Sequence, residues 1–326
     1  MRHADRAYRY VTTVASGSAL LFLLMIVIVL AVKSYPSIVV NGLKFFTGIT
    51  WNPSLNGELI RVNGVPTLQG ATYGAGVFLF GTLVSSAIAM LLGVPAGIGI
   101  ALFLTQVAPQ RVSRMVSFLV ELLAGIPSVV YGFWGLVVLL PLLLQVIEPA
   151  MASLFFWVPG LNGQPYGAGL LGSGIILSLM IVPIVASISR DVMLQTPLEL
   201  IEGGAALGLT KWEITRKIIL PYAKTGVIGA VILGLGRALG EVMAVALVSG
   251  SALNALPNSL YSPINTIAAF MAESLDSAFT DPSGMYVSAL FELGLLLLVI
   301  TLAVNFIARL LIKQGFVSKA ETVIKV

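Results

Sequence analysis

The chain has 326 residues, of which 58% are hydrophobic and 10% are charged, with a formal net charge of +4 and a mean hydropathy of +1.00. Soluble domains carry about 25% charged residues, so this composition excludes an ordinary soluble enzyme and indicates an integral membrane protein. Because the chain has no cysteine and a single histidine, His3, it has no disulfide framework, and we expect no metal site.

Several apolar runs are long enough to cross a bilayer, which takes roughly 20 residues for each helix. The first run follows a basic tail, is longer than a signal-peptide core and lacks a clear cleavage site, so we expect it to remain as a membrane span. The predicted fold is therefore an all-α integral membrane bundle. Its six predicted spans are Val11–Val32, Gly76–Leu104, Val116–Leu144, Leu170–Ser189, Thr225–Ser249 and Val287–Ile312.

Basic residues gather on one side of the membrane if the predicted spans alternate in direction. Those on this side are Arg2, Arg6, Arg9, Arg111, Arg114, Arg190, Lys211, Arg216, Lys217, Lys224, Arg309, Lys313, Lys319 and Lys325. The opposite side holds Lys33, Lys44 and Arg61. Because connections rich in lysine and arginine stay in the cytoplasm, we expect both termini to be cytoplasmic.

The first external loop, Ser34 to Ala75, is long and polar. Turn signals occur in it at Tyr35-Pro36, Asn52-Pro53, Asn56-Gly57 and Asn63-Gly64. The loop could hold a short hairpin, cover the mouth of the bundle, or be an ordered cap without a further role. Together with the third external loop, Asn254 to Met285, it is a candidate surface for an extracytoplasmic partner.

Proline interrupts three central spans, at Gly93-Val94-Pro95, at Gly125-Ile126-Pro127 and at Pro183. Proline removes a backbone donor and kinks a helix. In lipid, the freed carbonyl groups need partners from neighbouring helices or from a water-filled cavity. Three such breaks favour a translocation bundle over a simple membrane anchor.

A polar segment between the fourth and fifth spans carries two helix-start patterns. Thr196-Pro197-Leu198-Glu199 combines a capping threonine, a proline at the first helical position and a glutamate three residues after the cap, so it predicts a helix from Pro197. Gly208 can end that helix in a left-handed conformation. Thr210-Lys211-Trp212-Glu213 repeats the pattern and predicts a second helix to about Ile219, which Pro221 closes.

Three interpretations of this segment compete. A DNA-binding helix-turn-helix fits its outline, but the segment is tethered between two spans and carries Glu199, Glu202 and Glu213, so we expect no nucleic acid partner. A passive loop would not need two capping patterns. A rigid docking element for a cytoplasmic partner fits best, with a small apolar face of Leu198, Ile201, Ala205 and Ala206.

The same segment resembles the signature of permease subunits of ABC importers, E-A-A-x(3)-G-x(9)-I-x-L-P. Gly203-Gly204 stands where alanines are usual. The resemblance implies a coupling helix that contacts a separate ATPase subunit, which binds ATP and Mg²⁺. This chain has no phosphate-binding loop, so we expect no cofactor and no catalytic residue in it. The implied coupling residues are Glu199, Glu202, Gly203, Gly204, Ala205, Gly208, Ile218, Leu220 and Pro221.

The fifth predicted span carries Arg237 and Glu241, which would share one face of a helix. Each alone would cost about 2.5–3.5 kcal/mol at mid-membrane, so such residues face a cavity or each other. Gly229, Gly236 and Gly240 form a neighbouring stripe of small residues suited to close helix packing. The pair could fix the rotation of the helix. Alternatively, Arg237 contacts a passing oxyanion while Glu241 weakens its hold.

Two further stretches resemble permease subunits of phosphate ABC importers. They are Gly234–Glu241 in the fifth span and Glu121–Leu136 in the third. The Phe133-Trp134-Gly135-Leu136 ending, the Trp51-Asn52-Pro53 loop and Ser288-Ala289-Leu290 resemble the C-type subunit. The resemblance extends from the first span to Ile312. Outside these motifs, Glu121 and Glu292 lie near the ends of their spans and are expected to be interfacial or structural.

The resemblance implies a six-helix permease of type I, MetI-like architecture in a bacterial cytoplasmic (inner) membrane. It divides the chain into residues 1–75, a permease core 76–312 with the coupling segment 196–221, and a tail 313–326. The implied partners are an A-type permease, two ATPase copies, an extracytoplasmic phosphate-binding protein, phosphate and membrane lipid.

Four alternatives remain open from the sequence. The chain could be the A-type subunit, or a permease for another tetrahedral oxyanion such as sulfate or molybdate. A secondary anion transporter or channel would also use an intramembrane arginine, but it would not need the capped cytoplasmic segment. A membrane scaffold or signalling subunit would need docking but not the charged pair.

Overall fold

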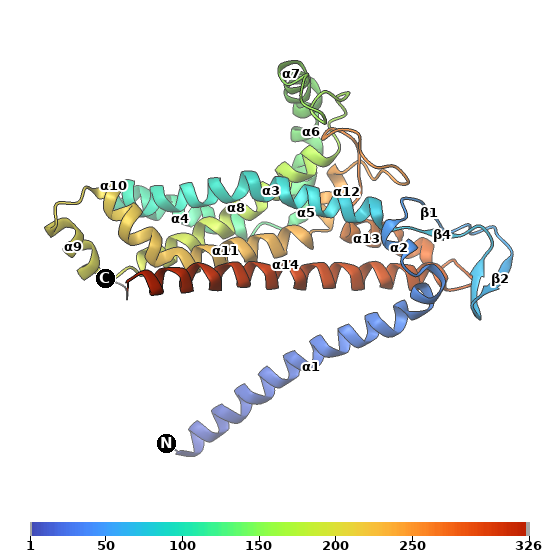
Figure 1. Ribbon diagram of the computed structural model, residues 1–326, viewed down its shortest axis with the longest axis horizontal. Coiled ribbons are helices and arrows are strands. Elements are labelled where there is room, and N and C mark those ends of the chain that lie inside the picture. The colour runs from blue at the N-terminus through green and yellow to red at the C-terminus, as the bar shows by residue number, and fades with distance from the viewer. Residues whose placement is uncertain (1, 324–326) are drawn as a thin grey trace. The chain divides into compact units, whose positions relative to one another are not determined.

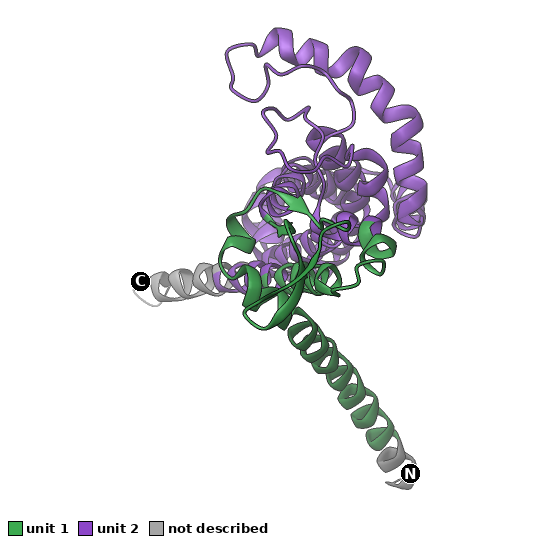
Figure 2. Ribbon diagram, turned by 90° about the vertical axis from the view of Figure 1, so that its right-hand side faces the viewer, with its two compact units in different colours: residues 1–75, 274–299 green, residues 76–273, 300–326 purple. Residues whose placement is uncertain are grey.

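The computed structural model describes the backbone of residues 2–323 and the side chains of residues 8–307, 309 and 310. Several side chains used in the sequence argument therefore lie outside the described residues, namely those of Arg2, His3, Arg6, Lys313, Lys319 and Lys325. The chain forms two compact units, residues 1–75 with 274–299 and residues 76–273 with 300–326 (Figure 2).

Six helices of the described chain are long and apolar enough to cross a membrane (Figure 1). This confirms the predicted all-α membrane fold and the number of spans. The helices are Tyr8–Asn41, Gly76–Val107, Ser128–Leu154, Leu170–Leu194, Lys211–Leu239 and Met285–Ile307. The third and fifth begin and end at residues well away from the predicted bounds, for reasons given below.

The first unit holds a long helix and two small antiparallel sheets. Its elements are α1 (Arg2–Asn41), α2 (Lys44–Thr47), β1 (Trp51–Asn52), β2 (Leu59–Val62), β3 (Val65–Leu68) and β4 (Thr72–Tyr73). β1 pairs with β4, and β2 pairs with β3. The last two helices, α13 (Ile267–Ala278) and α14 (Met285–Val323), contribute residues to both units.

The hairpin of β2 and β3 confirms one of the predicted alternatives for the first external loop. Its two turn residues, Asn63 and Gly64, have φ angles of 52° and 81°. A two-residue turn with positive φ at both positions follows the twist of antiparallel strands, and Asn-Gly is the sequence that favours it. The turn is therefore fixed by local chemistry.

The second unit is a helical bundle. Its elements before α13 are α3 (Gly76–Leu102), η1 (Phe103–Val107), α4 (Gln110–Ala124), α5 (Ser128–Trp134), η2 (Gly135–Leu139), α6 (Leu140–Leu142), η3 (Leu143–Ile147), α7 (Glu148–Leu154), α8 (Leu170–Leu194), α9 (Leu198–Ala206), α10 (Lys211–Ile214), η4 (Thr215–Ile219), α11 (Leu220–Leu239) and α12 (Met243–Val248). Both α3 and α11 pack against α8 (Figure 1). The contact with α3 is close enough that a Cβ atom on Gly93 would lie 2.6 Å from Cγ1 of Ile181.

Only one of the three predicted proline breaks interrupts a helix. Pro95 lies inside α3 and Pro183 inside α8, and both helices continue through them, so these two predictions are wrong. A helix can tolerate one lost hydrogen bond where packing against neighbours holds both of its halves. At Gly125-Ile126-Pro127 the chain does leave the helix, between α4 and α5. The third span therefore begins at Ser128, and α4 is a separate amphipathic helix.

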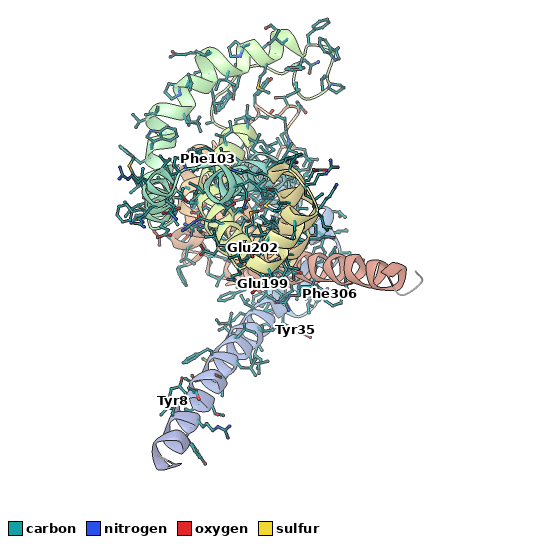
Figure 3. All side chains as sticks on the ribbon, turned by 90° about the vertical axis from the view of Figure 1, so that its left-hand side faces the viewer. Tyr8, Tyr35, Phe103, Glu199, Glu202 and Phe306 are labelled. Atoms are coloured by element: carbon teal, nitrogen blue, oxygen red, sulfur yellow. The ribbon has the colours of Figure 1, made fainter. Side chains whose placement is uncertain are left out.

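The third span also contains two turns of π-helix, η2 and η3. The amide of Leu140 bonds to the carbonyl of Gly135, and the amide of Glu148 bonds to that of Leu143. Each π-turn is followed within two residues by a proline, Pro141 or Pro149. A π-turn shifts the backbone hydrogen bonds by one residue. The helix can therefore continue through a proline, which has no amide hydrogen to donate. Figures 2 and 3 show the helix bending in an arch over this stretch.

Candidate functional site

The coupling segment begins with α9, whose N-cap is Pro197 and not the predicted Thr196. The Thr196 hydroxyl donates instead to the carbonyl of Met193 at 2.9 Å, so it closes the end of α8. Thr196 is buried, and this carbonyl three residues back is the acceptor within its reach. The first predicted capping box is therefore wrong, although Glu199 still lies in the first turn of α9, where a carboxylate is favourable.

Gly208 ends α9 as predicted. Its φ angle is 80°, in the left-handed region that glycine adopts without strain. Its amide bonds to the carbonyl of Ala205 at 2.9 Å, and the amide of Leu209 bonds to that of Gly204 at 3.1 Å. These two bonds form a Schellman motif, which satisfies carbonyl groups at a helix end. The turn between the two coupling helices therefore has one defined shape.

The second capping box is confirmed. The amide of Glu213 donates to the Thr210 hydroxyl at 3.3 Å, and the amide of Thr210 donates to the Glu213 carboxylate at 3.0 Å. Lys217 forms an ion pair with the other carboxylate oxygen at 3.0 Å. The start of α10 is thus fixed by residues that are adjacent in the sequence.

Pro221 does not close the second helix, contrary to prediction. The helical run continues from Lys211 to Leu239 through α10, η4 and α11. At the junction, the amide of Leu220 bonds to the carbonyl of Thr215, which is a π-type bond. The π-turn of η4 accommodates the proline, as in the third span. The second helix of the coupling segment, α10, therefore continues into the fifth span without a break.

The coupling segment divides into a packed side and an exposed side. Ile214 and Ile219 are buried in a cluster with Met193 of α8 and Ala101 of α3, and Gly204 is buried so closely that a Cβ there would lie 2.5 Å from Cδ1 of Ile218. The exposed side carries Leu198, Glu199, Glu202, Gly203, Ala205, Ala206, Leu207, Gly208 and Trp212. Leu207 is 84% exposed and Trp212 is 64% exposed. Glu199 and Glu202 lie one turn apart on α9 (Figure 3).

The different roles of Thr196 and Thr210 can be tested by substitution. Thr210→Val removes the capping hydroxyl of α10, which costs about 0.5–2 kcal/mol, so amide exchange over residues 211–214 is expected to become faster. Thr196→Val, which removes a hydroxyl that caps no helix start, is expected to leave exchange in α9 unchanged. Hydrogen exchange measured by mass spectrometry checks both variants. Faster amide exchange in α9 of the Thr196 variant would instead show that Thr196 caps this helix.

Arg237 and Glu241 do not lie on one helix. α11 ends at Leu239, and Glu241 lies in the connection to α12, where its carboxylate accepts from the amide of Ala244 at 3.3 Å. No ion pair joins Arg237 and Glu241 among the described side chains. The prediction of a shared helix face is therefore wrong. A carboxylate gains more from the unpaired amides and positive dipole of the α12 N-terminus than from continuing a glycine-rich helix.

The small residues that bring α11 close to α8 are also not the predicted ones. Gly229 and Gly236 have open space where a Cβ would be, whereas a Cβ on Gly234 would lie 3.3 Å from Cγ2 of Val185. Gly226 is still closer to Val192. Successive residues of an α-helix are 100° apart around its axis. Arg237 therefore lies on the same side of α11 as Gly226 and Gly234, which face α8. Its Nε atom is buried without a hydrogen-bond partner. Arg237 therefore keeps an unused donor inside the bundle.

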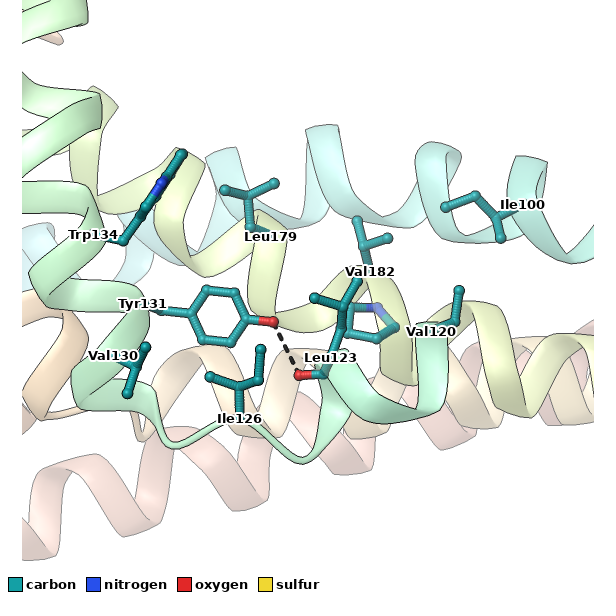
Figure 4. Close-up of a pocket in the computed structure, with 10 residues that line it drawn as sticks. Ile100, Val120, Leu123, Ile126, Val130, Tyr131, Trp134, Leu179 and Val182 are labelled. Carbon is teal, nitrogen blue, oxygen red and sulfur yellow. Dashed lines mark hydrogen bonds between the residues drawn. The ribbon is translucent and has the colours of Figure 1, made fainter. Parts of the chain in front are cut away.

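A cavity of about 470 Å³ lies between α3, α4, α5 and α8 (Figure 4). Its lining is almost wholly apolar, and the Tyr131 hydroxyl donates across the α4–α5 break to the carbonyl of Leu123 at 2.9 Å. Sequence reasoning did not single out Tyr131, although it lies in the Glu121–Leu136 stretch. Its hydrogen bond crosses a break between α4 and α5, and the sequence predicted one span there, so no local signal indicated the contact.

Sequence reasoning also did not single out Glu148 and Tyr261, two buried polar residues. Glu148 is fully buried, and its Oε2 atom accepts from the amides of Tyr166 and Gly167 at 2.7 and 2.8 Å, which anchors the loop between the third and fourth spans. Nearby, Tyr261 donates to the carbonyl of Leu161 at 2.8 Å; burial, and then the charge of Glu148, raises the pKa of its hydroxyl. Arg190 pairs with Glu121 at 3.5 Å and links α8 to α4.

Comparison with known proteins places these features in one family. Residues 93–314 match the family described as "Binding-protein-dependent transport system inner membrane component". The chain is 43% identical over 316 residues to the phosphate transport system permease protein PstC 1 of Mycobacterium bovis, covering 95% of this chain and 94% of that protein. It is 41% identical to the phosphate transport system permease protein PstC of Mesorhizobium japonicum, over 95% and 90% of the two chains.

A solved structure supports the same fold. The inward-facing MetNI methionine ABC transporter contains a chain that matches with a TM-score of 0.51 at 19% identity, over 73% of this chain and 92% of that one. The type I, MetI-like fold expected from the sequence is therefore confirmed. The chain belongs to the binding-protein-dependent transport system inner membrane components, as a PstC-type permease subunit.

Proposed function

We propose that this chain is the C-type permease subunit of an ATP-driven importer that carries inorganic phosphate across the cytoplasmic membrane of a bacterium. The observation that carries this proposal is the 43% identity to a phosphate transport system permease, which extends over 95% of the chain. An alignment of this length includes both the coupling segment and the helix with Arg237.

Arg237 is the proposed contact for phosphate in the pathway. It lies in the last turn of α11, within a helix long and apolar enough to cross a membrane, and its Nε is buried without a hydrogen-bond partner among the described residues. A planar guanidinium matches an oxyanion with two parallel donors. Glu241 lies four residues on, at the start of α12, and contributes negative charge that keeps the anion weakly held. The carboxylate acts from the helix break and not from the same helix face.

The exposed side of the coupling segment is the proposed contact for the ATPase. Its exposed large apolar residues are Leu198, Leu200, Leu207 and Trp212. Glu199 and Glu202 are exposed on the same segment. Two ATPase copies bind ATP and Mg²⁺ and supply the chemistry, and this chain contributes no catalytic group and no cofactor. Because the Gly208 turn has one defined shape and α10 continues into α11, ATPase movement at the segment is transmitted to the helix with Arg237.

The remaining partners complete the importer. An A-type permease forms the pathway together with this chain, within membrane lipid, and a phosphate-binding protein delivers phosphate from outside. Both termini are cytoplasmic in this arrangement. Residues 1–75 provide the first span and the external hairpin, 76–312 form the permease core with the coupling segment 196–221, and 313–326 form a tail.

Purification of the native complex tests this assignment. We expect an A-type permease, an ATPase and a binding protein to accompany the chain, and phosphate to be the anion that the binding protein carries. A binding protein loaded with sulfate or molybdate would assign the chain to another oxyanion. Isolation without any ATPase, together with anion transport that persists without ATP, would favour a secondary transporter or channel.

A further inference from the structure

A polar joint holds α1 to α14 inside the first unit. Pro36 lies inside α1, between Lys33 and Ser37. The Ser288 hydroxyl of α14 accepts from the amide of Ser37 at 3.0 Å and donates to the carbonyl of Lys33 at 2.8 Å. One side chain of α14 therefore bonds to the backbone of α1 on both sides of Pro36.

A buried carboxylate strengthens this joint. Glu292, which is 3% exposed, accepts a short hydrogen bond from the Ser37 hydroxyl. The same hydroxyl accepts a hydrogen bond from the side-chain amide of Asn41 at 3.0 Å. Ser288 and Glu292 are four residues apart on α14, so both reach the same side of that helix. The position of α1 against α14 at Pro36 is thus specified by several bonds.

Beside the joint lies a cavity of about 550 Å³. One wall is the α1 end, and the other comprises the end of α13 and the beginning of α14. Most of its lining is apolar, with one basic and one acidic residue. Its lining includes Val32, Lys33, Asp281, Val287, Ser288 and Phe291.

The two charged residues of this cavity differ in whether their charge is offset by neighbouring groups. Asp281 is 7% exposed, and its carboxylate accepts from the amides of Ser283 and Tyr286, each at 2.8 Å, at the start of α14. Helix amides there offset its charge. Lys33 is exposed, and none of the described acidic side chains forms an ion pair with it. The cavity therefore offers a lysine whose charge is not paired.

The depth of Lys33 in the membrane follows from the sequence. It is the first charged residue after the uncharged run Val11–Val32, so it marks the outer end of the first span. Lysines at span ends place their ammonium groups at the level of lipid headgroups. Val32, Val287 and Phe291 add apolar surface to the same cavity, and Phe291 lies one helical turn further into the last span than Val287.

We propose that this cavity binds one anionic phospholipid, with its phosphate group at Lys33 and an acyl chain against Val32, Val287 and Phe291. The rigid joint at Pro36 and Ser288 keeps the cavity open. The bound lipid seats the outer end of the first span in the membrane. This site is separate from Arg237 and from the coupling segment, and it does not depend on the identity of the transported anion.

Native mass spectrometry of the detergent-purified complex tests the site, with phosphatidylglycerol, phosphatidylcholine and inorganic phosphate as probes. We expect Lys33→Gln to bind phosphatidylglycerol about fivefold more weakly, since a lysine near a membrane surface contributes about 1 kcal/mol to the binding of anionic lipid. Binding of phosphatidylcholine is expected to stay unchanged. Val287→Trp fills the cavity while keeping Lys33, and is expected to lose the same phosphatidylglycerol adduct.

Lys44→Gln is the matched control, because Lys44 is an exposed lysine of the same unit that does not line the cavity. It is expected to bind phosphatidylglycerol like the unaltered chain. Equal loss in the Lys33 and Lys44 variants would overturn the site and leave only general surface charge. Displacement of phosphatidylglycerol by inorganic phosphate would overturn the lipid assignment in favour of a free anion.

Discussion

Replacing Arg237 with alanine is expected to reduce phosphate uptake about 10- to 150-fold, because a hydrogen bond to a charged group contributes about 1.5–3 kcal/mol. The guanidinium has no ion-pair partner among the described residues, and its Nε is unused, so the protein itself loses little when the side chain is removed. The substituted subunit is therefore expected to assemble normally. Uptake of radiolabelled phosphate by cells that depend on this importer provides the measurement.

Two further variants sharpen this test. Arg114→Ala removes an exposed arginine of α4 and should leave uptake unchanged. Arg237→Lys keeps the charge but loses the planar fork of donors, so it should retain only part of the activity. Normal uptake by Arg237→Ala would mean that this residue has no part in the phosphate pathway. Loss of the subunit from the membrane would instead assign it a structural role.

Replacing Gly208 with valine is expected to separate ATP hydrolysis from transport. The φ angle of 80° forces an L-residue into the left-handed region, which costs about 1–2 kcal/mol, and disturbs the Schellman bonds of Leu209 and Gly208. That cost corresponds to a factor of about 5–30 in the population of the native turn. Phosphate carried per ATP hydrolysed, measured on the reconstituted importer, should fall by this factor. Glu202→Ala, on the exposed face of α9, should act in the same direction.

Gly203→Ala is the control for the glycine effect. Gly203 lies in α9 with open space around the position of a Cβ, so alanine fits and improves helix propensity by about 1 kcal/mol. Its coupling ratio should match that of the unaltered importer. A normal ratio in the Gly208 variant, or an equal fall in both variants, would argue against transmission through the Gly208 turn.

The predictions that hold are those fixed by neighbours in the sequence. Asn63-Gly64 forms its turn, Gly208 adopts its left-handed conformation, and Thr210 and Glu213 cap each other, because each depends on side chains within a few residues. The number of membrane spans could also be predicted from the sequence, because it depends on the hydropathy and length of each apolar run. Family resemblance then supplied the architecture that local patterns cannot give.

The predictions that fail involve competition between local and distant partners. Thr196 matches a capping pattern, but in its buried position it bonds to Met193 instead. Pro183 lies inside α8, whose packing against neighbouring helices holds it together across the missing bond. Arg237 and Glu241 have helical spacing, yet the chain turns at Gly240, and Glu241 bonds to an amide of α12.

The hydrogen-bond partners of two buried glutamates, Glu148 and Glu292, could not be predicted from the sequence. Glu148 anchors residues 166 and 167, and Glu292 receives the hydroxyl of Ser37 from the first span. The sequence suggested only an interfacial or structural role for Glu292. No pattern around these glutamates indicates their partners, because the contacts exist only after the helices have packed.

Phosphate uptake into sealed vesicles tests the central claim most directly. The purified complex is reconstituted with its binding protein outside and ATP enclosed at the ATPase side, and labelled phosphate is counted inside. We predict uptake that requires ATP, is not inhibited by excess sulfate or molybdate, and falls about 10- to 150-fold with Arg237→Ala. Uptake that continues without ATP, or equal inhibition by sulfate, would contradict a phosphate-specific, ATP-driven permease.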